Sequence, residues 1–317
     1  MAVYFLNLKT FGRSSGSSAV SAAAYRAGER IRDERTGRIY DHSDRQDVLH
    51  KEILLPSEFA NDDMSWAKER GTLWNAAEGA ESRINARVAR EYMVALPVEL
   101  SPESRTSLVT GFARELVERY RFAVDVAIHA ARNFPGSDPR NFHAHLLATT
   151  REVKLEGLGA KTTLEWSDAR RREIGLEPAI NELLHVRERW ALAANAALEQ
   201  AHLTTRIDHR TLRAQGIDRE PRPQIPKAAF EMERHGYYSP VAERVRADHE
   251  ARLAARLPRE VQAAPVLTEP APAEPQSAEE IRKRSVENWL RYRQAQAQTE
   301  PAPDDSANRT RKNDLSL

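Results

Sequence analysis

The stretch over residues 141–150 (NFHAHLLATT) most constrains the fold of this chain, because apolar residues flank a His-Ala-His core on both sides. This pattern is typical of a β-strand. Side chains of a strand alternate between its two faces, so His143 and His145 are predicted to leave the same face. Two imidazoles in this arrangement can bind one metal ion. The simpler interpretation is a chance polar pair on a half-exposed strand.

A third histidine lies in the preceding strand-like run. His129 comes near the end of residues 122–131 (FAVDVAIHAA), and an antiparallel pairing of the two runs would place it beside His143 and His145. Neutral imidazole is the commonest protein ligand for divalent transition metals, and three histidines leave coordination positions open for a substrate. We therefore predict a metal site at His129, His143 and His145 that is suited to polarise a phosphoryl oxygen.

Tyr25 is a candidate nucleophile on a predicted helix. Residues 18–30 (SAVSAAAYRAGER) follow a Gly/Ser loop whose last serines can cap the helix. A tyrosine phenol has a pKa of about 10, so a nearby metal ion or cation must activate it. Arg26 is adjacent in sequence, and the small residues 22–24, Ala27 and Gly28 would let a DNA backbone approach the ring. The competing interpretation is a packed aromatic residue.

Two further sets of charged residues are candidates. Glu91 lies in a strand-like run over residues 88–96 (VAREYMVAL), where it is either exposed at an edge or turned toward the site as a base or metal partner. A later basic stretch is either a phosphate-contacting surface or a solvated face. Its arginines, interleaved with acidic residues, are Arg206, Arg210, Arg213, Arg219 and Arg222.

The remaining pattern predicts an α+β fold. We expect a central antiparallel sheet of about five strands with packed helices within residues 1–155. A hairpin turn is predicted at residues 35–38, and the signal becomes helical after Arg151, over about residues 160–235. Residues 236–317 are predicted to be partly helical and largely disordered, because Pro, Ala and Glu dominate beyond Pro258. The predicted strands lie at residues 2–9, 48–56, 88–96, 122–131 and 141–150. One or two helices are predicted within residues 62–83, and one each at 101–120 and 278–294.

Composition excludes several classes of function. The chain of 317 residues has 48 basic and 47 acidic residues, a net charge of +1, so global charge identifies no partner. No cysteine is present, which excludes disulfides, thiolate catalysis and cysteine-ligated zinc. The first apolar run is too short for a signal peptide, and no run of roughly 18 apolar residues is long enough to span a bilayer. We expect a soluble cytoplasmic protein.

Four motifs follow one another along the chain: SAVSAAAYRAGERIRDERTGRIYDHS, REYMVALPVEL, NFHAHLLATTRE and RIDHRTLRAQGI. Together they resemble the MobA/MobL family of conjugative relaxases, the MOBQ type, over about residues 1–235. The resemblance implies an HUH endonuclease fold, a central antiparallel sheet with packed helices. It further implies that Tyr25 is the nucleophile, that His129, His143 and His145 hold the metal, and that Glu91 is the family's acidic position.

The reaction that this resemblance implies is strand-specific nicking at a plasmid origin of transfer, with a 5′-phosphotyrosine intermediate and a free 3′-hydroxyl. The expected cofactor is a divalent ion, Mg²⁺ or Mn²⁺ first, with no small-molecule cofactor. Expected partners are single-stranded origin DNA, accessory mobilisation proteins and a type IV coupling protein. Larger relatives carry a helicase or primase region, but the sequence has no GxxxxGK[ST] loop, so we expect a stand-alone or truncated relaxase.

Three other functions fit part of the pattern. A rolling-circle replication initiator would use the same residues on a different DNA. A catalytically inactive DNA-binding relative would keep the fold alone. A histidine-ligated metal enzyme acting on small molecules fits the histidine pair but leaves Tyr25 unexplained.

Overall fold

The computed structural model of the chain describes residues 2–131 and 138–256. Contacts between residues divide the chain into two compact units, Met1–Thr211 and a second unit that begins at Leu212. The predicted helix over residues 278–294 and the predicted disorder beyond Pro258 lie outside the described residues. The predicted domain boundary near residue 235 stays a prediction.

A five-stranded antiparallel sheet forms the centre of the first unit, in the order β1-β5-β7-β6-β4. The prediction of an α+β fold with about five antiparallel strands is confirmed. β7, which carries the histidine pair, is the middle strand, and this position explains why Ala144 and residues 146–148 are apolar. The strands are β1 (Leu6–Gly12), β4 (Val48–Leu54), β5 (Arg87–Ala95), β6 (Val124–His129) and β7 (His143–Thr149).

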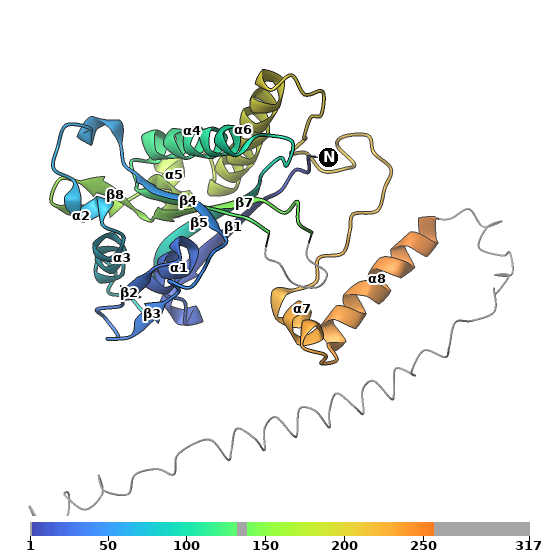
Figure 1. Cartoon of the computed structure of the whole chain (residues 1–317), viewed down its shortest axis with the longest axis horizontal. Helices are drawn as coiled ribbons and strands as arrows, with labels where there is room; N and C mark the ends of the chain where they lie inside the picture. Colours follow the sequence, from blue (N-terminus) through green and yellow to red (C-terminus); the bar gives the residue numbers. More distant parts are fainter. Residues whose placement is uncertain (1, 132–137, 257–317) are drawn as a thin grey trace, which may run out of the picture. The chain divides into compact units, whose positions relative to one another are not determined.

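Two long helices, α4 (Pro102–Tyr120) and α6 (Ala179–Gln200), cover one face of this sheet (Figure 1). α4 begins as its sequence predicts, because the Ser101 side chain caps it and a proline occupies its first turn. Phe112 of α4 and Trp190 of α6 meet edge to face, with ring centroids 5.1 Å apart. Burial of such large aromatic side chains stabilises the packing of both helices.

The opposite face is covered by α1 (Ala19–Ala27) and α3 (Arg70–Gly79) (Figure 1). The predicted serine cap of α1 is confirmed, because the Ser18 side chain accepts a hydrogen bond from the backbone N–H of Ser21. A second acceptor at the same end is Glu78 of α3, whose carboxylate accepts from the backbone N–H of Ala19 at 2.7 Å. These bonds fix the start of α1 against α3.

The alanines of α1 have a different role from the one expected. Residues 22–24 were expected to leave room for a DNA backbone, but their side chains are buried beneath α1 in the apolar core of this face. Their small size lets the helix pack closely on the sheet and on α3. The end of α1 is equally tight, because Gly28 has a φ of +60° and an added Cβ would lie 3.2 Å from the Val48 side chain.

Two hairpins flank the sheet. The turn predicted at residues 35–38 joins β2 (Arg30–Arg32) to β3 (Ile39–Asp41) and is confirmed. The expectation that helical structure follows Arg151 is wrong for the next ten residues, which form β8 (Arg151–Lys154) and β9 (Gly157–Lys161). Gly157 has a φ of +147°, a conformation that favours glycine and turns the chain back.

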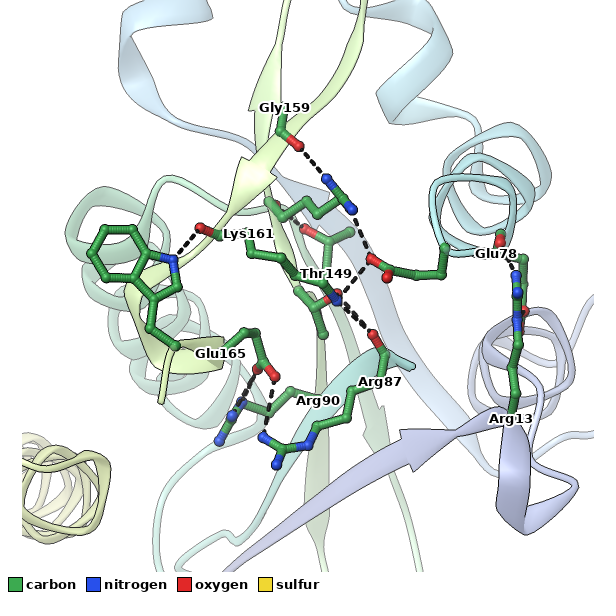
Figure 2. Close-up of polar contacts among 12 residues, drawn as sticks. Arg13, Glu78, Arg87, Arg90, Thr149, Gly159, Lys161 and Glu165 are labelled. Atoms are coloured by element: carbon green, nitrogen blue, oxygen red, sulfur yellow. Dashed lines mark hydrogen bonds and ion pairs between the residues drawn. The ribbon is translucent and has the colours of Figure 1, made fainter. Parts of the chain in front are cut away.

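Polar contacts tie this second hairpin and the segment after it to β5 (Figure 2). Lys161 donates to the backbone carbonyl of Arg87 at 2.8 Å. The buried guanidinium of Arg90 pairs with the Glu165 carboxylate at 2.7 Å. These contacts therefore hold the hairpin and the segment after it at the N-terminal end of β5.

The other helices are short, except in the second unit. The range 62–83, predicted to hold one or two helices, holds two, α2 and α3. Within the described residues no helix is long and apolar enough to cross a membrane. In the second unit, Glu233 and Arg246 join two helices through a double ion pair at 2.6 and 2.7 Å. The remaining helices are α2 (Ser65–Lys68), α5 (Asp168–Glu173), α7 (Lys227–Arg234) and α8 (Pro240–Arg256), with 3-10 turns at Arg13–Ser15, Ser57–Phe59 and Thr163–Glu165.

A buried charged contact holds α3 on the sheet and gives the first prediction. Arg70 donates twice to the Asp125 carboxylate, at 2.8 and 3.0 Å, and the Trp74 indole donates to it at 2.9 Å. Asp125→Ala leaves both donors without this acceptor, so we expect the free energy of unfolding to fall by about 3–5 kcal/mol. Urea denaturation measures this change.

Arg119→Ala, which breaks a more exposed ion pair with Glu182, is the control and should cost less than about 1 kcal/mol. Equal effects of the two substitutions would contradict the prediction.

Candidate active site on the α1 face of the sheet

The register of three strands brings the predicted histidines together. His129 of β6 pairs directly with His143 of β7, and His145 follows two residues later on the same face. On the other side of β7, Glu91 of β5 pairs with Leu147, which lies two residues after His145 in the same strand. Directly paired residues share a face, so all four side chains lie on the face that α1 and α3 cover.

The three imidazole rings form a compact cluster. Their centroids are 5.3 Å apart for His129 and His143, 4.8 Å for His129 and His145, and 5.2 Å for His143 and His145. One nitrogen from each ring lies within 4.8 Å of the other two. The predicted proximity of His129 to the pair is therefore confirmed.

Hydrogen bonds define the tautomers of two of these histidines. His129 Nε2 lies 2.7 Å from the backbone oxygen of Arg26, and His143 Nδ1 lies 3.1 Å from that of Asn141. A carbonyl oxygen only accepts, so these two nitrogens carry the protons. The lone pairs then belong to His129 Nδ1 and His143 Nε2.

His145 is oriented by a carboxylate. Its Nδ1 donates to Glu91 at 2.6 Å, which leaves the lone pair on Nε2. Glu91 is buried and also accepts from the Arg26 guanidinium. A carboxylate bonded to the far nitrogen of a histidine fixes the ring orientation and raises its strength as a metal ligand.

The electrostatic surroundings keep the histidines neutral and Glu91 ionised. Burial lowers the pKa of His129 to about 3 and lowers the pKa values of His143 and His145 as well, the last against the opposing effect of Glu91. Burial by itself would raise the pKa of Glu91, but hydrogen bonds from His145 and Arg26 outweigh it and lower the pKa to about 2. Neutral imidazole is the form that binds metals.

Tyr25 lies on α1 beside this cluster. The next residue, Arg26, accepts the His129 hydrogen bond through its carbonyl, so the backbone of α1 contacts the cluster directly. The Tyr25 ring meets His42 edge to face, with centroids 5.2 Å apart. The Arg45 guanidinium stacks over the same ring, 4.2 Å from its centroid.

Arg45 and Asp47 are site residues that the sequence analysis missed. Arg45 lies in the loop between β3 and β4, and its Nη2 is 3.3 Å from His129 Nδ1 and 2.5 Å from the Asp47 carboxylate. The local sequence Asp-Arg-Gln-Asp is typical of an exposed turn. No local signal therefore identifies these two side chains as neighbours of the histidines.

The arginines predicted to bind DNA are distributed differently. Arg26 is largely enclosed, and it donates to Glu91 and to the Ala22 carbonyl. Arg206 donates to the backbone oxygens of Leu203 and Thr205. Arg210 pairs with Asp208 at 2.6 Å. Arg213 is exposed and belongs to the second unit. Their role in DNA binding stays a prediction.

The donor set fits a divalent metal ion. Three neutral nitrogen donors converge from two neighbouring strands, and each ring has its other nitrogen bonded to an acceptor. Three nitrogen ligands leave open coordination positions, as in catalytic rather than closed structural sites. The arrangement can therefore hold an ion with room for an oxygen ligand from a substrate.

Comparison with known proteins relates this chain to a family. The model of the MobA/MobL family matches residues 17–235. The chain is 36% identical over 253 residues to mobilization protein MobL of Acidithiobacillus ferridurans, a match that covers 74% of the chain and 64% of that protein. It is also 36% identical over 246 residues to mobilization protein A of Escherichia coli, covering 74% of the chain and 31% of that protein.

The fold is also similar to that of a solved structure. It comes from work on the molecular basis of vancomycin resistance transfer in Staphylococcus aureus, is 29% identical, and superposes with a TM-score of 0.53. The match covers 66% of the chain and all of that structure. The chain spans less than two thirds of the length of these curated relatives, and it belongs to the MobA/MobL family.

Proposed function

We propose that this protein is a conjugative relaxase, which nicks one strand of plasmid DNA at an origin of transfer and later rejoins it. The observation that carries the proposal is the placement of Tyr25, on α1, next to a cluster of three neutral histidines on one sheet face. Membership of the MobA/MobL family and relatives named for mobilization support it.

The reaction we propose is a transesterification at phosphorus. The Tyr25 phenol loses its proton and its oxygen bonds to the scissile phosphate. The bond from phosphorus to the 3′ oxygen breaks, and that oxygen gains a proton to leave a 3′-hydroxyl. The DNA stays attached as a 5′-phosphotyrosine, and the reverse steps rejoin the strand without an external energy source.

A divalent ion, Mg²⁺ or Mn²⁺ first, would be held by His129 Nδ1, His143 Nε2 and His145 Nε2. When bound, such an ion stabilises the negative charge that develops on the phosphate oxygens. Nitrogen ligands favour Mn²⁺ over Mg²⁺, so Mn²⁺ is the better probe of the site.

The neighbouring residues have supporting roles in this proposal. Glu91 orients His145, and its low pKa makes it a weak base at neutral pH. The basic residues Arg206, Arg210 and Arg213 are proposed to contact DNA phosphates. Accessory mobilisation proteins and a type IV coupling protein would act with the protein on plasmid DNA in the bacterial cytoplasm.

Removal of the Tyr25 hydroxyl tests the nucleophile. Tyr25→Phe keeps the ring under Arg45 but has no oxygen to bond to phosphorus, so we expect no covalent protein–DNA adduct and retained DNA binding. Labelled single-stranded origin oligonucleotides with Mn²⁺, resolved on a denaturing gel, measure the adduct. Tyr40→Phe, which removes the hydroxyl of a tyrosine outside the cluster, is the control and should react normally.

Three results would contradict the proposal. An adduct in the Tyr25→Phe protein would exclude Tyr25 as the nucleophile. Cleavage of replication origins but not of transfer origins would identify a rolling-circle initiator. Unchanged DNA with every divalent ion would identify an inactive DNA-binding relative.

The carboxylate behind His145 gives a second test. Glu91→Gln removes the charge that orients His145, so we expect affinity for Mn²⁺ to fall by about 10–100-fold. Isothermal titration calorimetry measures this affinity. Glu165→Gln is a matched control, because Glu165 is equally buried and paired with an arginine on the other face of the sheet; it should leave the affinity unchanged. A Glu91→Gln protein with the affinity of the original chain would refute the orienting role.

The lowered pKa values of the histidines predict how metal binding depends on pH. Protonation competes with the ion, so affinity is lost as pH falls through the histidine pKa. Histidines at the ordinary pKa of about 6.5 would each weaken binding about tenfold at pH 5.5. Here all three pKa values are lowered, which moves this loss to lower pH. We expect the dissociation constant for Mn²⁺ to rise much less than about a thousandfold between pH 7.5 and 5.5. A rise of about a thousandfold would show ordinary histidines.

A further inference from the structure

The Arg45 side chain links the proposed nucleophile to the proposed metal site. Its Nη1 donates to the backbone oxygen of Tyr25, and its guanidinium covers the Tyr25 ring at 4.2 Å. Nε and Nη2 both donate to the Asp47 carboxylate, at 2.8 and 2.5 Å. The Arg45 side chain is only 8% exposed, so these contacts hold it in one position.

The remaining contact of Arg45 is with a proposed metal ligand. Nη2 lies 3.3 Å from His129 Nδ1. His129 Nε2 carries the ring proton because it donates to the Arg26 carbonyl, so Nδ1 accepts from Arg45. Nδ1 also has the lone pair that a metal ion would use. Arg45 and the ion therefore compete for one lone pair, and their positive charges repel each other.

We propose that Arg45 is a positioning residue that holds Tyr25 against the histidine cluster and, at the same time, limits how tightly the cluster binds a divalent ion. The proposal rests on the proposed function for the role of Tyr25. Asp47 offsets part of the Arg45 charge, so it favours the ion. An arginine with this double role makes the ion exchangeable while it keeps the nucleophile in place.

This proposal predicts effects of opposite sign on binding and on reaction. Arg45→Met removes the repulsion and the competing hydrogen bond, and it removes the guanidinium that offsets the Asp47 charge. We expect Mn²⁺ to bind about tenfold or more tightly. The Tyr25 ring loses its cation and its backbone anchor, so we expect the rate of adduct formation to fall about a hundredfold. Loss of a purely structural residue would weaken both.

The experiment uses the full chain and two readouts, calorimetry with Mn²⁺ and adduct formation on origin DNA. Asp47→Asn should weaken Mn²⁺ binding about tenfold, because the Arg45 charge is then unopposed. Arg45→Lys keeps the charge without the planar guanidinium, so Mn²⁺ affinity should change less than about threefold while adduct formation falls. Arg38→Met is the matched control, since Arg38 also covers a tyrosine ring, that of Tyr40, with its guanidinium 5.1 Å from the ring centroid. Neither readout should change in this variant.

The outcomes separate this inference from the proposed function. Unchanged or weaker Mn²⁺ binding in Arg45→Met, with normal reaction of the original chain, overturns the role of Arg45 alone. A chain that forms no adduct overturns the proposed function, whatever the calorimetry shows. If Arg45→Met fails to fold by circular dichroism, Arg45→Lys and Asp47→Asn decide, because affinity changes other than those given above overturn the proposal.

Discussion

The pairing of β6 with β7 is the constraint on which the site depends. His129 lies directly opposite His143, and His145 follows on the same face. Side chains along a strand alternate with a period of two, so a shift of one residue would send His129 to the face covered by α4 and α6. The hydrophobic pattern excludes that shift, since Val126 and Ile128 of β6 would leave their apolar core with it. One register therefore buries the core and assembles the histidines.

The docking of α1 on the same face completes the arrangement. Its small side chains let the helix lie close to the sheet, where the Arg26 carbonyl accepts from His129. Glu78 of α3 accepts from the first N–H of α1. Backbone contacts at both ends of a short helix therefore place Tyr25, and its ring also contacts His42 and Arg45.

The charges around the cluster are paired rather than free. Glu91 bonds to Arg26 and His145, and Asp47 bonds to Arg45. Buried charges are costly unless such partners satisfy them, and here the pairs surround three neutral imidazoles. This pairing lets a strongly polar site lie inside the first unit. Local charge, not global charge, defines the chemistry.

The sequence by itself determined the α+β class, the antiparallel sheet, the serine-capped helix of Tyr25 and the histidines as one group, because period-two patterns, caps and the family motifs are local signals. Tertiary structure alone decided the β8–β9 hairpin, the burial of the α1 alanines and the engagement of Arg26 with Glu91. It also brought Arg45 and Asp47 from an ordinary polar loop to the nucleophile and the histidines. Contacts of this kind join residues 20 to 103 positions apart in the sequence. No local sequence pattern encodes which distant polar side chain will bond to a buried histidine nitrogen.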